Sequence, residues 1–488
     1  MYSRHCVPLC RTRFNLSFLP QTGIEAACPD TVKFNMPSPR GHFTFQLNRS
    51  AVEVNNVAPQ TTLLDFVRSQ GLTGAKEGCA EGECGACAVL LVREVAGRTT
   101  LLAANSCLIP LPMVAGAEVY TVEGLAQADR LCEVQQAMVE RGGSQCGYCT
   151  PGFIVSMFAE QARLSGEPVS ASSLGGNLCR CTGYRPIRDA MESLGPMAQG
   201  PWLQRLTQPV PAVSAFHYET PQGRFSQPDS LAECMALAAQ DPQARWVAGN
   251  TDLGVVTNIR QQRFPHLISL ENVPELRECH NEPAHVEIGA ALTLREIEVL
   301  WADAPPVLTE WLALFASPLI RNRATLGGNL VTASPIGDAA PLLLALGADV
   351  RLSRVGGERI IPLAEFFLAY RQTALQAGEL LRSIRIPKPF PSRVRFYKVA
   401  KRRMDDISTV AACFSTGSQV RLAFGGVAAI PVRVPAAERI LDDALDWNRA
   451  KKAIAQSLTP IGDHRGSAAY RSAVAQSLLD KFQTEWTA

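Results

Sequence analysis

The sequence predicts an α+β protein built from several domains, and three observations support this prediction. At 488 residues the chain is too long for one ordinary hydrophobic core, so three or four domains are expected. Strand-like alternation and helix-like periodicity both occur, in separate stretches of the chain. Eight of the 15 cysteines form two compact sets, which sets the first part of the chain apart from the rest.

Composition excludes several classes of protein. The 47 Lys and Arg residues nearly balance the 45 Asp and Glu residues, so no basic excess indicates a nucleic-acid partner. The longest apolar candidate, Pro341–Ala348, is far shorter than the roughly 20 residues that span a bilayer, so we expect no membrane insertion. An odd number of cysteines argues against a simple disulfide framework and favours metal ligation. Thiolate ligands and the lack of an export signal predict a cytoplasmic protein.

Residues 1–41 differ from the sequence that follows. Their first acidic residue is Glu25, and they contain no apolar stretch with a small-residue cleavage site. We interpret this segment as a disordered extension or as a mis-assigned start, with translation beginning at Met36. Its three cysteines are not expected to be ligands.

Residues 42–115 are predicted to form a small β-grasp domain. Alternating apolar residues over 43–54, interrupted by Asn48-Arg49, predict a hairpin. A helix is expected within residues 61–71, capped by a threonine and ended by a glycine. A loop rich in Gly and Cys then leads into an apolar strand over residues 78–92.

Residues 116–195 are predicted to form a helical domain that carries the second cysteine set in its turns. The four expected helices cover residues 131–141, residues 152–164, a short stretch after Ser170 or Ser172, and residues 186–194. Thr150 and Pro151 open the second of them as cap and first helical residue. Residues 196–215 are rich in Pro and Gln and lack periodicity, which predicts an interdomain linker.

The remainder of the chain reads as two further domains. Residues 216–387 mix strand and helix patterns, and residues 388–488 form a smaller α+β region. Prolines at 387, 389 and 391 mark the hinge between them.

The first cysteine set has the spacing of a plant-type ferredoxin, in which four thiolates hold a [2Fe-2S] cluster. Its members are Cys79, Cys84, Cys87 and Cys107. Glycines at 78, 82 and 85 allow the loop to fold closely around the cluster and to present backbone N–H groups to it. A zinc site or a buried group of free cysteines is the alternative, but zinc usually takes two separated pairs of ligands.

The second cysteine set consists of Cys146, Cys149, Cys179 and Cys181. Taken alone it is less specific, because C-x2-C pairs also occur in zinc and redox sites. Two thiolates separated by one residue must bend sharply around a single metal, which favours a second iron-sulfur cluster over zinc.

Two glycine loops lie in the segment 216–387. The first glycine loop follows a predicted strand and consists of Val247, Ala248, Gly249, Asn250, Thr251, Asp252, Leu253 and Gly254. The second glycine loop consists of Thr325, Leu326, Gly327, Gly328 and Asn329, and is followed by Ser334–Asp338 with an acidic residue able to bind ribose hydroxyls. Small residues let the backbone approach a phosphate closely, so two such loops predict a dinucleotide, although neither is a GxGxxG motif.

The strings GCAEGECGAC, QCGYCTPG and NLCRCTGYRPI resemble the two iron-sulfur domains of the xanthine oxidoreductase family of molybdenum hydroxylases. All eight cysteines match in order, and the resemblance runs from about residue 42 to the C-terminus. It implies a plant-type ferredoxin domain, a four-helix [2Fe-2S]-binding domain, a vanillyl-alcohol-oxidase-like FAD domain and a C-terminal flavoprotein domain. Gln145 matches a position that approaches the pterin of the molybdenum cofactor in relatives.

The same resemblance implies which residues contact FAD. The first glycine loop becomes the pyrophosphate loop, the second glycine loop adjoins it, and further contacts are implied for Phe315, Asp338, Leu381 and Lys398. Phe315 and Leu381 could equally be core residues, and Lys398 a solvated charge. The string KVAKRRMDDIS resembles the segment beside the isoalloxazine ring, with Asp405-Asp406 near the NAD entrance; a solvated charge run is the alternative.

The function implied by the resemblance is electron transfer. Single-chain relatives carry a long molybdenum-binding region after the flavin domain, and this sequence shows no counterpart, so we expect that region on a partner subunit, in a dimer of heterodimers. Electrons from the oxidation of hypoxanthine or xanthine to urate would pass through the second cluster, the first cluster and FAD to NAD. No residue of this chain is expected to act in the purine chemistry.

Three other functions remain open on the sequence. The chain could serve an aldehyde, nicotinate or carbon monoxide hydroxylase, although those often place the iron-sulfur and flavin parts on separate chains. It could be a stand-alone iron-sulfur flavoprotein reductase without a molybdenum partner. It could also be a zinc-stabilised interaction scaffold, which would be colourless rather than brown.

Overall fold

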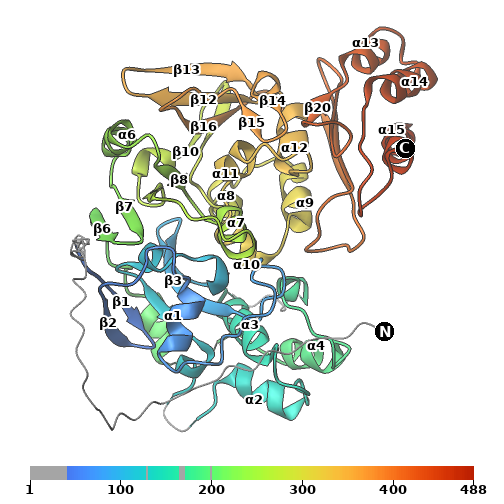
Figure 1. The fold of residues 1–488 in the computed structure, drawn as a ribbon. Helices are drawn as coiled ribbons and strands as arrows, with labels where there is room; N and C mark the ends of the chain where they lie inside the picture. The colour runs from blue at the N-terminus through green and yellow to red at the C-terminus, as the bar shows by residue number, and fades with distance from the viewer. Residues whose placement is uncertain (1–40, 128–129, 164–170, 198–199, 488) are drawn as a thin grey trace, which may run out of the picture. The chain divides into compact units, whose positions relative to one another are not determined.

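The structure is a computed structural model that describes residues 41–127, 130–163, 171–197 and 200–487 (Figure 1). The predicted extension, apart from Gly41, lies outside the described residues. The described chain is a multidomain α+β protein, as predicted. No helix in these residues is long and apolar enough to cross a membrane.

The first domain is a five-stranded mixed sheet with helix α1 (Leu63–Ser69) packed against it. In the order β2-β1-β5-β3-β4 its strands are β2 (Ser50–Val54), β1 (Phe43–Leu47), β5 (Glu118–Tyr120), β3 (Ala88–Val95) and β4 (Arg98–Asn105). Asn48 and Arg49 both have positive φ, which matches the twist of a tight hairpin between β1 and β2. Thr62 caps α1 by accepting the amide of Asp65 at 3.0 Å. These features confirm the β-grasp prediction.

The second domain is helical, also as predicted, and packs around buried residues such as Phe153, Met157 and Ile187. Its elements are α2 (Glu133–Glu140), α3 (Thr150–Arg163), the 3-10 turn η4 (Ala171–Leu174) and α4 (Arg185–Glu192). The third expected helix is therefore a single 3-10 turn in the described residues. Serines and the glycines that follow it favour turns over a longer helix.

The predicted linker, residues 196–215, contains helix α5 (Pro201–Leu206), which docks on the iron-sulfur domains. The ring of Trp202 lies 4.7 Å from that of Tyr120 and 5.0 Å from that of Phe158. Arg205 pairs with the nearly buried Glu118 at 2.6 Å. Aperiodic sequence therefore encodes a packed helix here, because one large aromatic residue supplies most of its contacts.

The third domain contains two sheets and a layer of helices. The first sheet has the order β6 (Phe216–Thr220), β7 (Gly223–Gln227), β9 (His266–Ser269) and β8 (Arg245–Val247). The second has the order β10 (Cys279–Asn281), β11 (His285–Gly289), β16 (Leu380–Pro387), β12 (Asp349–Arg354) and β13 (Gly357–Pro362). A separate hairpin pairs β14 (Phe367–Ala369) with β15 (Gln372–Thr373).

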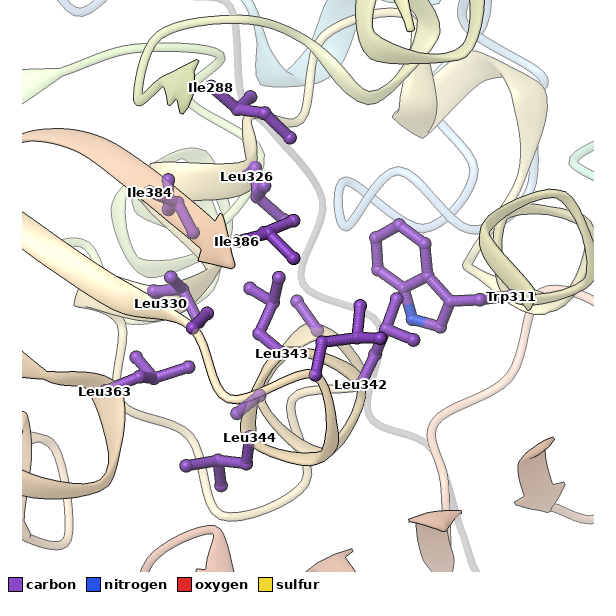
Figure 2. Packing of buried hydrophobic residues seen from close by; sticks show 14 of the residues in the cluster. Ile288, Trp311, Leu326, Leu330, Leu342, Leu343, Leu344, Leu363, Ile384 and Ile386 are labelled. Carbon is purple, nitrogen blue, oxygen red and sulfur yellow. The ribbon is translucent and has the colours of Figure 1, made fainter. Parts of the chain in front are cut away.

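The helices of the third domain are α6 (Leu231–Gln240), α7 (Leu253–Ile259), α8 (Leu294–Leu300), α9 (Pro306–Leu314), α10 (Pro318–Arg321), α11 (Leu326–Val331) and α12 (Ala339–Ala345). Helices α8 to α12 enclose its largest hydrophobic core, whereas α6 and α7 pack against other buried clusters. Figure 2 shows leucines of α12 gathered with Trp311 of α9 and Ile386 of β16 in this core. Every residue of α12 is buried, as expected for the apolar segment that begins at Pro341.

The C-terminal domain is a four-stranded antiparallel sheet covered by helices. Its elements are β17 (Arg393–Val399), β18 (Val410–Thr416), β19 (Arg421–Gly425), β20 (Val432–Arg433), α13 (Pro435–Ala444), α14 (Trp447–Ser457) and α15 (Ala468–Thr487). Strand β18 is buried along its whole length because α12 and α15 both pack against it. The third domain and the C-terminal domain therefore share a packed boundary.

We predict that Trp202→Ala lowers the free energy of unfolding of the iron-sulfur domains by about 3–5 kcal/mol, the usual cost of removing a buried Trp side chain. Denaturant unfolding followed by circular dichroism measures this loss. The matched control is Gln204→Ala, an exposed position on the same helix, which should change stability by less than about 0.5 kcal/mol. Equal stability of the two variants would mean that α5 is not held by its aromatic anchor.

Candidate functional site

The first cysteine set lies on the loop between α1 and β3 and on the 3-10 turn η1 (Ser106–Leu108). The Sγ atoms of Cys87 and Cys107, both buried, are 3.3 Å apart. The thiols of Cys79 and Cys84 also contact each other, and the contact with Cys84 lowers the pKa of Cys79 to about 5. The four thiols therefore converge as two pairs, 79 with 84 and 87 with 107.

The loop around this set is shaped by backbone that has no room for side chains. A Cβ built on Gly78 would lie 2.7 Å from the Sγ atom of Cys84, and Gly82 and Gly85 have φ of +82° and +66°. The backbone amide of Glu81 donates to the Sγ atom of Cys79 at 3.4 Å. The glycines therefore leave room for the loop to close around the sulfurs, and the loop presents an N–H group to them, that of Glu81.

The second cysteine set lies in two turns of the helical domain, one before α3 and one before α4. Its thiols also converge as two pairs, because Cys146 contacts Cys181 and Cys149 contacts Cys179. Burial opposes ionisation of Cys179, but hydrogen bonds from the hydroxyl and the amide of Thr182 outweigh it and lower the pKa of that thiol.

Two pairs of thiols suit a [2Fe-2S] cluster, because each of its two irons takes two cysteine ligands. In both sets at least one pair contains a thiol whose pKa is lowered, and the thiolate is the form that binds iron. In the described part of the chain, no three His, Cys, Asp or Glu side chains are arranged to hold a single metal ion. The donor arrangement therefore fits two clusters better than zinc.

Backbone contacts join the two cysteine sets. The amide of Leu178, the residue before Cys179, donates to the carbonyl of Cys84 at 3.0 Å. A Cβ on Gly152, in the first turn of α3, would overlap the carbonyl oxygen of Gly85. The helical domain therefore lies directly against the ligand loop of the first set, through these peptide groups and through the side-chain amide of Asn177, which donates to the carbonyl of Gly85 at 3.4 Å.

The first glycine loop connects β8 to α7 and packs against the segment that precedes the second glycine loop. A Cβ on Gly249 would overlap the carbonyl oxygen of Arg323, so the two loops adjoin. Asn250 has φ of +59°, and its side-chain amide donates to the carbonyl of Leu108 at 2.8 Å. The first glycine loop thus touches both the segment just before the second glycine loop and the turn that carries Cys107.

The second glycine loop starts helix α11 and contains close-packed backbone. Thr325 caps the helix by accepting the amide of Gly328 at 3.0 Å. A Cβ on Gly327 would lie 2.5 Å from that of Ala290. The Oδ1 atom of Asn329 is buried and has no hydrogen-bond partner among the described residues, which leaves an acceptor available to a ligand. These features fit a loop that approaches a dinucleotide.

Asp338 and Lys398 form a buried ion pair between the third domain and the C-terminal domain. The Nζ atom of Lys398 lies 2.7 Å from one carboxylate oxygen of Asp338, and the hydroxyl of Ser408 donates to the other at 2.5 Å. Both side chains are less than 10% exposed, so Lys398 is not a solvated charge. Both oxygens of Asp338 have protein partners, an arrangement that the sequence prediction of ribose binding did not include.

The other predicted flavin contacts occupy different environments. Phe315, at the end of α9, is buried 5.1 Å from the ring of Trp311, and Leu381 is buried on β16. Both belong to the main hydrophobic core. In the first glycine loop, Thr251, Asp252 and Leu253 are only partly buried, and Asp252 lies 3.7 Å from Arg371.

The segment Lys401–Ser408 combines exposed cations with a buried carboxyl group. Burial, followed by the nearby charge of Glu83, raises the pKa of Asp405 from 3.8 to about 7, although Arg402 and Lys398 oppose the change. Glu83 belongs to the ligand loop of the first cysteine set. A solvated charge run, the alternative for this segment, therefore does not describe Asp405, whose side chain is buried.

The polar residues that join the domains were not apparent from the sequence. They include Asn258 of α7, whose amide donates to the carbonyls of Ala80 and Cys107, and Asn322, whose amide donates to the carbonyl of Ala103. Single asparagines on a helix or at a helix end give no pattern of their own. Their partners are more than 150 residues away in the sequence, so only the folded chain identifies them.

Family models match four consecutive segments of the chain. They are the 2Fe-2S iron-sulfur cluster binding domain (residues 45–112), the [2Fe-2S] binding domain (121–192), the FAD binding domain in molybdopterin dehydrogenase (218–389) and the CO dehydrogenase flavoprotein C-terminal domain (395–486). The chain therefore carries two [2Fe-2S]-binding domains and one FAD-binding domain.

Curated relatives match most of the chain. A xanthine dehydrogenase from Drosophila pseudoobscura pseudoobscura is 33% identical, with 90% of this chain and 38% of that protein covered. A xanthine dehydrogenase/oxidase from Rattus norvegicus is 32% identical, with 79% and 34% covered. The chain thus spans little more than a third of the length of these relatives. Among solved structures, carbon monoxide dehydrogenase from Hydrogenophaga pseudoflava is 29% identical with a TM-score of 0.49, covering 53% of this chain and 94% of that one.

We predict that Gly152→Ala separates the two iron-sulfur domains, because the added Cβ would meet the backbone carbonyl of Gly85, which cannot rotate away. The cost should be about 1–3 kcal/mol of stability, with loss of iron from the first cysteine set. Thermal unfolding and iron content measure the two effects. Gly195→Ala is the control, since a Cβ there meets nothing within 4 Å. A Gly152→Ala protein with full iron content and unchanged stability would contradict the close backbone contact between the two iron-sulfur domains.

We predict that Asp405→Asn stabilises the protein at pH 8 and not at pH 4. A carboxyl group whose pKa rises from 3.8 to about 7 on folding favours the folded state at low pH, and this contribution is lost as the pH rises through 7. The loss amounts to at most about 4 kcal/mol, at 1.36 kcal/mol for each pKa unit. Unfolding midpoints between pH 4 and pH 8 measure it.

Asp406→Asn is the matched control and should have the opposite effect at pH 8. Burial is the largest single influence on the pKa of Asp406 and raises it, but the amide hydrogen bonds from Arg402 and Ile407, with the charge of Arg402, together outweigh burial and lower the pKa overall. Its charged form therefore stabilises the fold above pH 4. If both variants change stability in the same direction at pH 8, the assignment of Asp405 as a buried neutral acid is wrong.

Proposed function

The chain belongs to the molybdenum hydroxylase family, and from this premise we propose that it is the electron-transfer subunit of a xanthine dehydrogenase. In this proposal a partner subunit carries the molybdenum cofactor and oxidises hypoxanthine and xanthine to urate. This chain would accept the electrons and deliver them to NAD. The curated relatives reported above, which align with most of this chain, are named for xanthine, and that favours a purine over carbon monoxide, an aldehyde or nicotinate.

The observation that carries the proposal is the unbroken contact from the second cysteine set to the first glycine loop. Leu178 joins the second set to Cys84 through one backbone hydrogen bond. Asn258 and Asn250 then join the turn that carries Cys107 to α7 and the first glycine loop. Short separations between successive sites favour stepwise electron transfer, because the transfer rate falls steeply with distance.

The exposure of the cysteines indicates in which direction electrons would pass along this row of sites. Cys146 and Cys181 are exposed, and the apolar side chains of Tyr148 and Leu178 beside them are 49% and 38% exposed. Cys87 and Cys107, by contrast, are buried. An exposed apolar edge at the second set suits the docking of a partner subunit, so we propose that electrons enter there and leave at the flavin.

The protein's own residues hold and tune the groups that do the redox chemistry. When bound, the clusters would supply one-electron steps and FAD would supply a two-electron exchange with NAD. Eight cysteines would hold the clusters, and the amides of Glu81 and Thr182 stabilise charge on sulfur. The glycine loops would hold the dinucleotide, and the ion pair of Asp338 and Lys398 fixes the C-terminal domain beside them.

Three finer assignments belong to the same proposal. Eight thiolate ligands suit a reducing compartment, which supports a cytoplasmic location. Pairing with a molybdenum-binding subunit would give heterodimers, which we propose associate in pairs. The exposed cations of the segment Lys401–Ser408, on the C-terminal domain, are of the right charge to receive the phosphates of NAD.

We predict that the chain, purified without oxygen, contains FAD and about four irons, and that reduction gives two distinct paramagnetic signals. Cys107→Ser should remove one signal and leave the other, because the second cysteine set is separate. Cys413→Ser is the control, since Cys413 is buried in the C-terminal domain away from both sets. A single signal in the unmodified chain, or the absence of flavin, would contradict the proposal.

The substrate is tested with the partner subunit present. Co-expression with a molybdopterin-binding partner subunit should give NAD reduction that depends on xanthine. Activity with carbon monoxide, an aldehyde or nicotinate, and none with xanthine, would mean that the chain serves another molybdenum hydroxylase. Xanthine oxidation by this chain alone would contradict the two-subunit arrangement.

A further inference from the structure

One side chain of the FAD-binding domain reaches two peptide groups of the first cysteine set. Asn258, half-buried on α7, donates from its Nδ2 atom to the carbonyl of Ala80 at 2.9 Å and to the carbonyl of Cys107 at 2.8 Å. Cys79, the residue before Ala80, and Cys107 belong to different thiol pairs. A single amide therefore contacts the backbone beside both pairs of the first set.

The peptide between Ala80 and Glu81 is held at both of its ends. A peptide group is planar and trans, so its carbonyl and its N–H point in opposite directions. Asn258 holds the carbonyl end, and the N–H end donates to the Sγ atom of Cys79 at 3.4 Å. Asn258 thereby fixes the direction of a hydrogen bond to sulfur that it does not itself make.

The backbone at Ala80 indicates that this orientation is imposed. Ala80 has φ of +57°, a conformation that disfavours any residue with a Cβ atom. In this conformation the carbonyl of Ala80 accepts from Asn258 of α7, and the following N–H donates to the sulfur of Cys79. A strained residue at one of the two peptides that Asn258 holds shows that the surrounding contacts, and not local preference, set its direction.

We propose that Asn258 is a positioning residue that raises the reduction potential of the first cluster by holding the Ala80–Glu81 peptide with its N–H on Cys79. An N–H donor stabilises the extra negative charge of a reduced cluster more than it stabilises the oxidised form, and so raises the potential. The inference rests on the proposed function, because it requires a [2Fe-2S] cluster on the first set. It adds that the domain receiving the electrons tunes the cluster that delivers them.

The test uses Asn258→Leu, which removes both hydrogen bonds at nearly constant volume, in the full chain loaded with its clusters. Anaerobic redox titration followed by electron paramagnetic resonance gives the midpoint of each cluster, and a Cys181→Ser variant identifies the signal of the second. The midpoint of the first cluster should fall by an amount equivalent to about a tenfold change in its equilibrium, about 59 mV for one electron. The midpoint of the second cluster should not change.

Asn322→Leu is the matched control. Asn322 also belongs to the third domain and donates to a carbonyl of the first domain, that of Ala103, at 2.8 Å. The Ala103 carbonyl is not next to a cysteine of the first set. The control therefore loosens the same domain contact without touching a ligand peptide, and the midpoint of the first cluster should stay where it is.

Asn258→Ser supplies a second, milder variant, because a serine hydroxyl keeps one donor; a smaller fall in the same direction supports the proposal. An unchanged midpoint in both Asn258 variants overturns it. An equal fall in Asn322→Leu also overturns it, because the effect would then come from docking. Loss of the first signal in both Asn258 variants, with Asn322→Leu intact, shows a purely structural role and overturns it as well. If the unmodified chain lacks the first signal, the proposed function itself has failed.

Discussion

The ligand loop, residues 78–87, is closely packed against both neighbouring domains. Its conformation therefore restricts how the rest of the iron-sulfur region can be arranged. Gly152 of α3 meets the carbonyl of Gly85, and the amide of Leu178 meets the carbonyl of Cys84. From the third domain, Asn258 holds the carbonyl of Ala80. Each contact uses a backbone group of the loop, and such groups must be satisfied when buried. The position of both neighbouring domains is therefore tied to the conformation of one ten-residue segment.

This dependence explains how far the sequence could predict the site. The spacing of the first cysteine set matched a plant-type ferredoxin, whereas the second set depended on the resemblance of the whole pattern, and the alternation from Phe43 to Leu47 predicted the first hairpin. The helical threonine cap was also predictable, because Thr62 bonds to a residue only three positions away. Local chemistry at local spacing is visible in a single sequence.

Contacts between distant segments were not predictable in the same way. Asn258 lies 178 positions from Ala80, and Ser408 lies 70 positions from Asp338. The sequence indicated that Asp338 could bind ribose hydroxyls, and the structure adds that its buried carboxylate has two protein partners, Lys398 and Ser408. Helix α5 was missed for a related reason: its stability comes from Trp202 packing on Tyr120 and Phe158, not from periodicity.

The groups near the first cysteine set are of two kinds, titratable carboxyl groups and neutral hydrogen-bond donors. The two kinds would affect the reduction potential of a bound cluster in different ways. Glu83 and Asp405 are carboxyl groups whose pKa values are raised, chiefly by burial, and the pKa of Asp405 reaches about 7, so the charge of Asp405 changes near neutral pH. Asn258 and the amide of Glu81 are neutral donors whose dipoles do not titrate. A carboxylate beside an anionic cluster would oppose its reduction and would take up a proton in response. Fixed amide dipoles would stabilise the reduced sulfurs without taking up a proton. The part of the reduction potential that does not change with pH would therefore come from oriented peptide groups. The residues that hydrogen-bond to those peptides set their orientation.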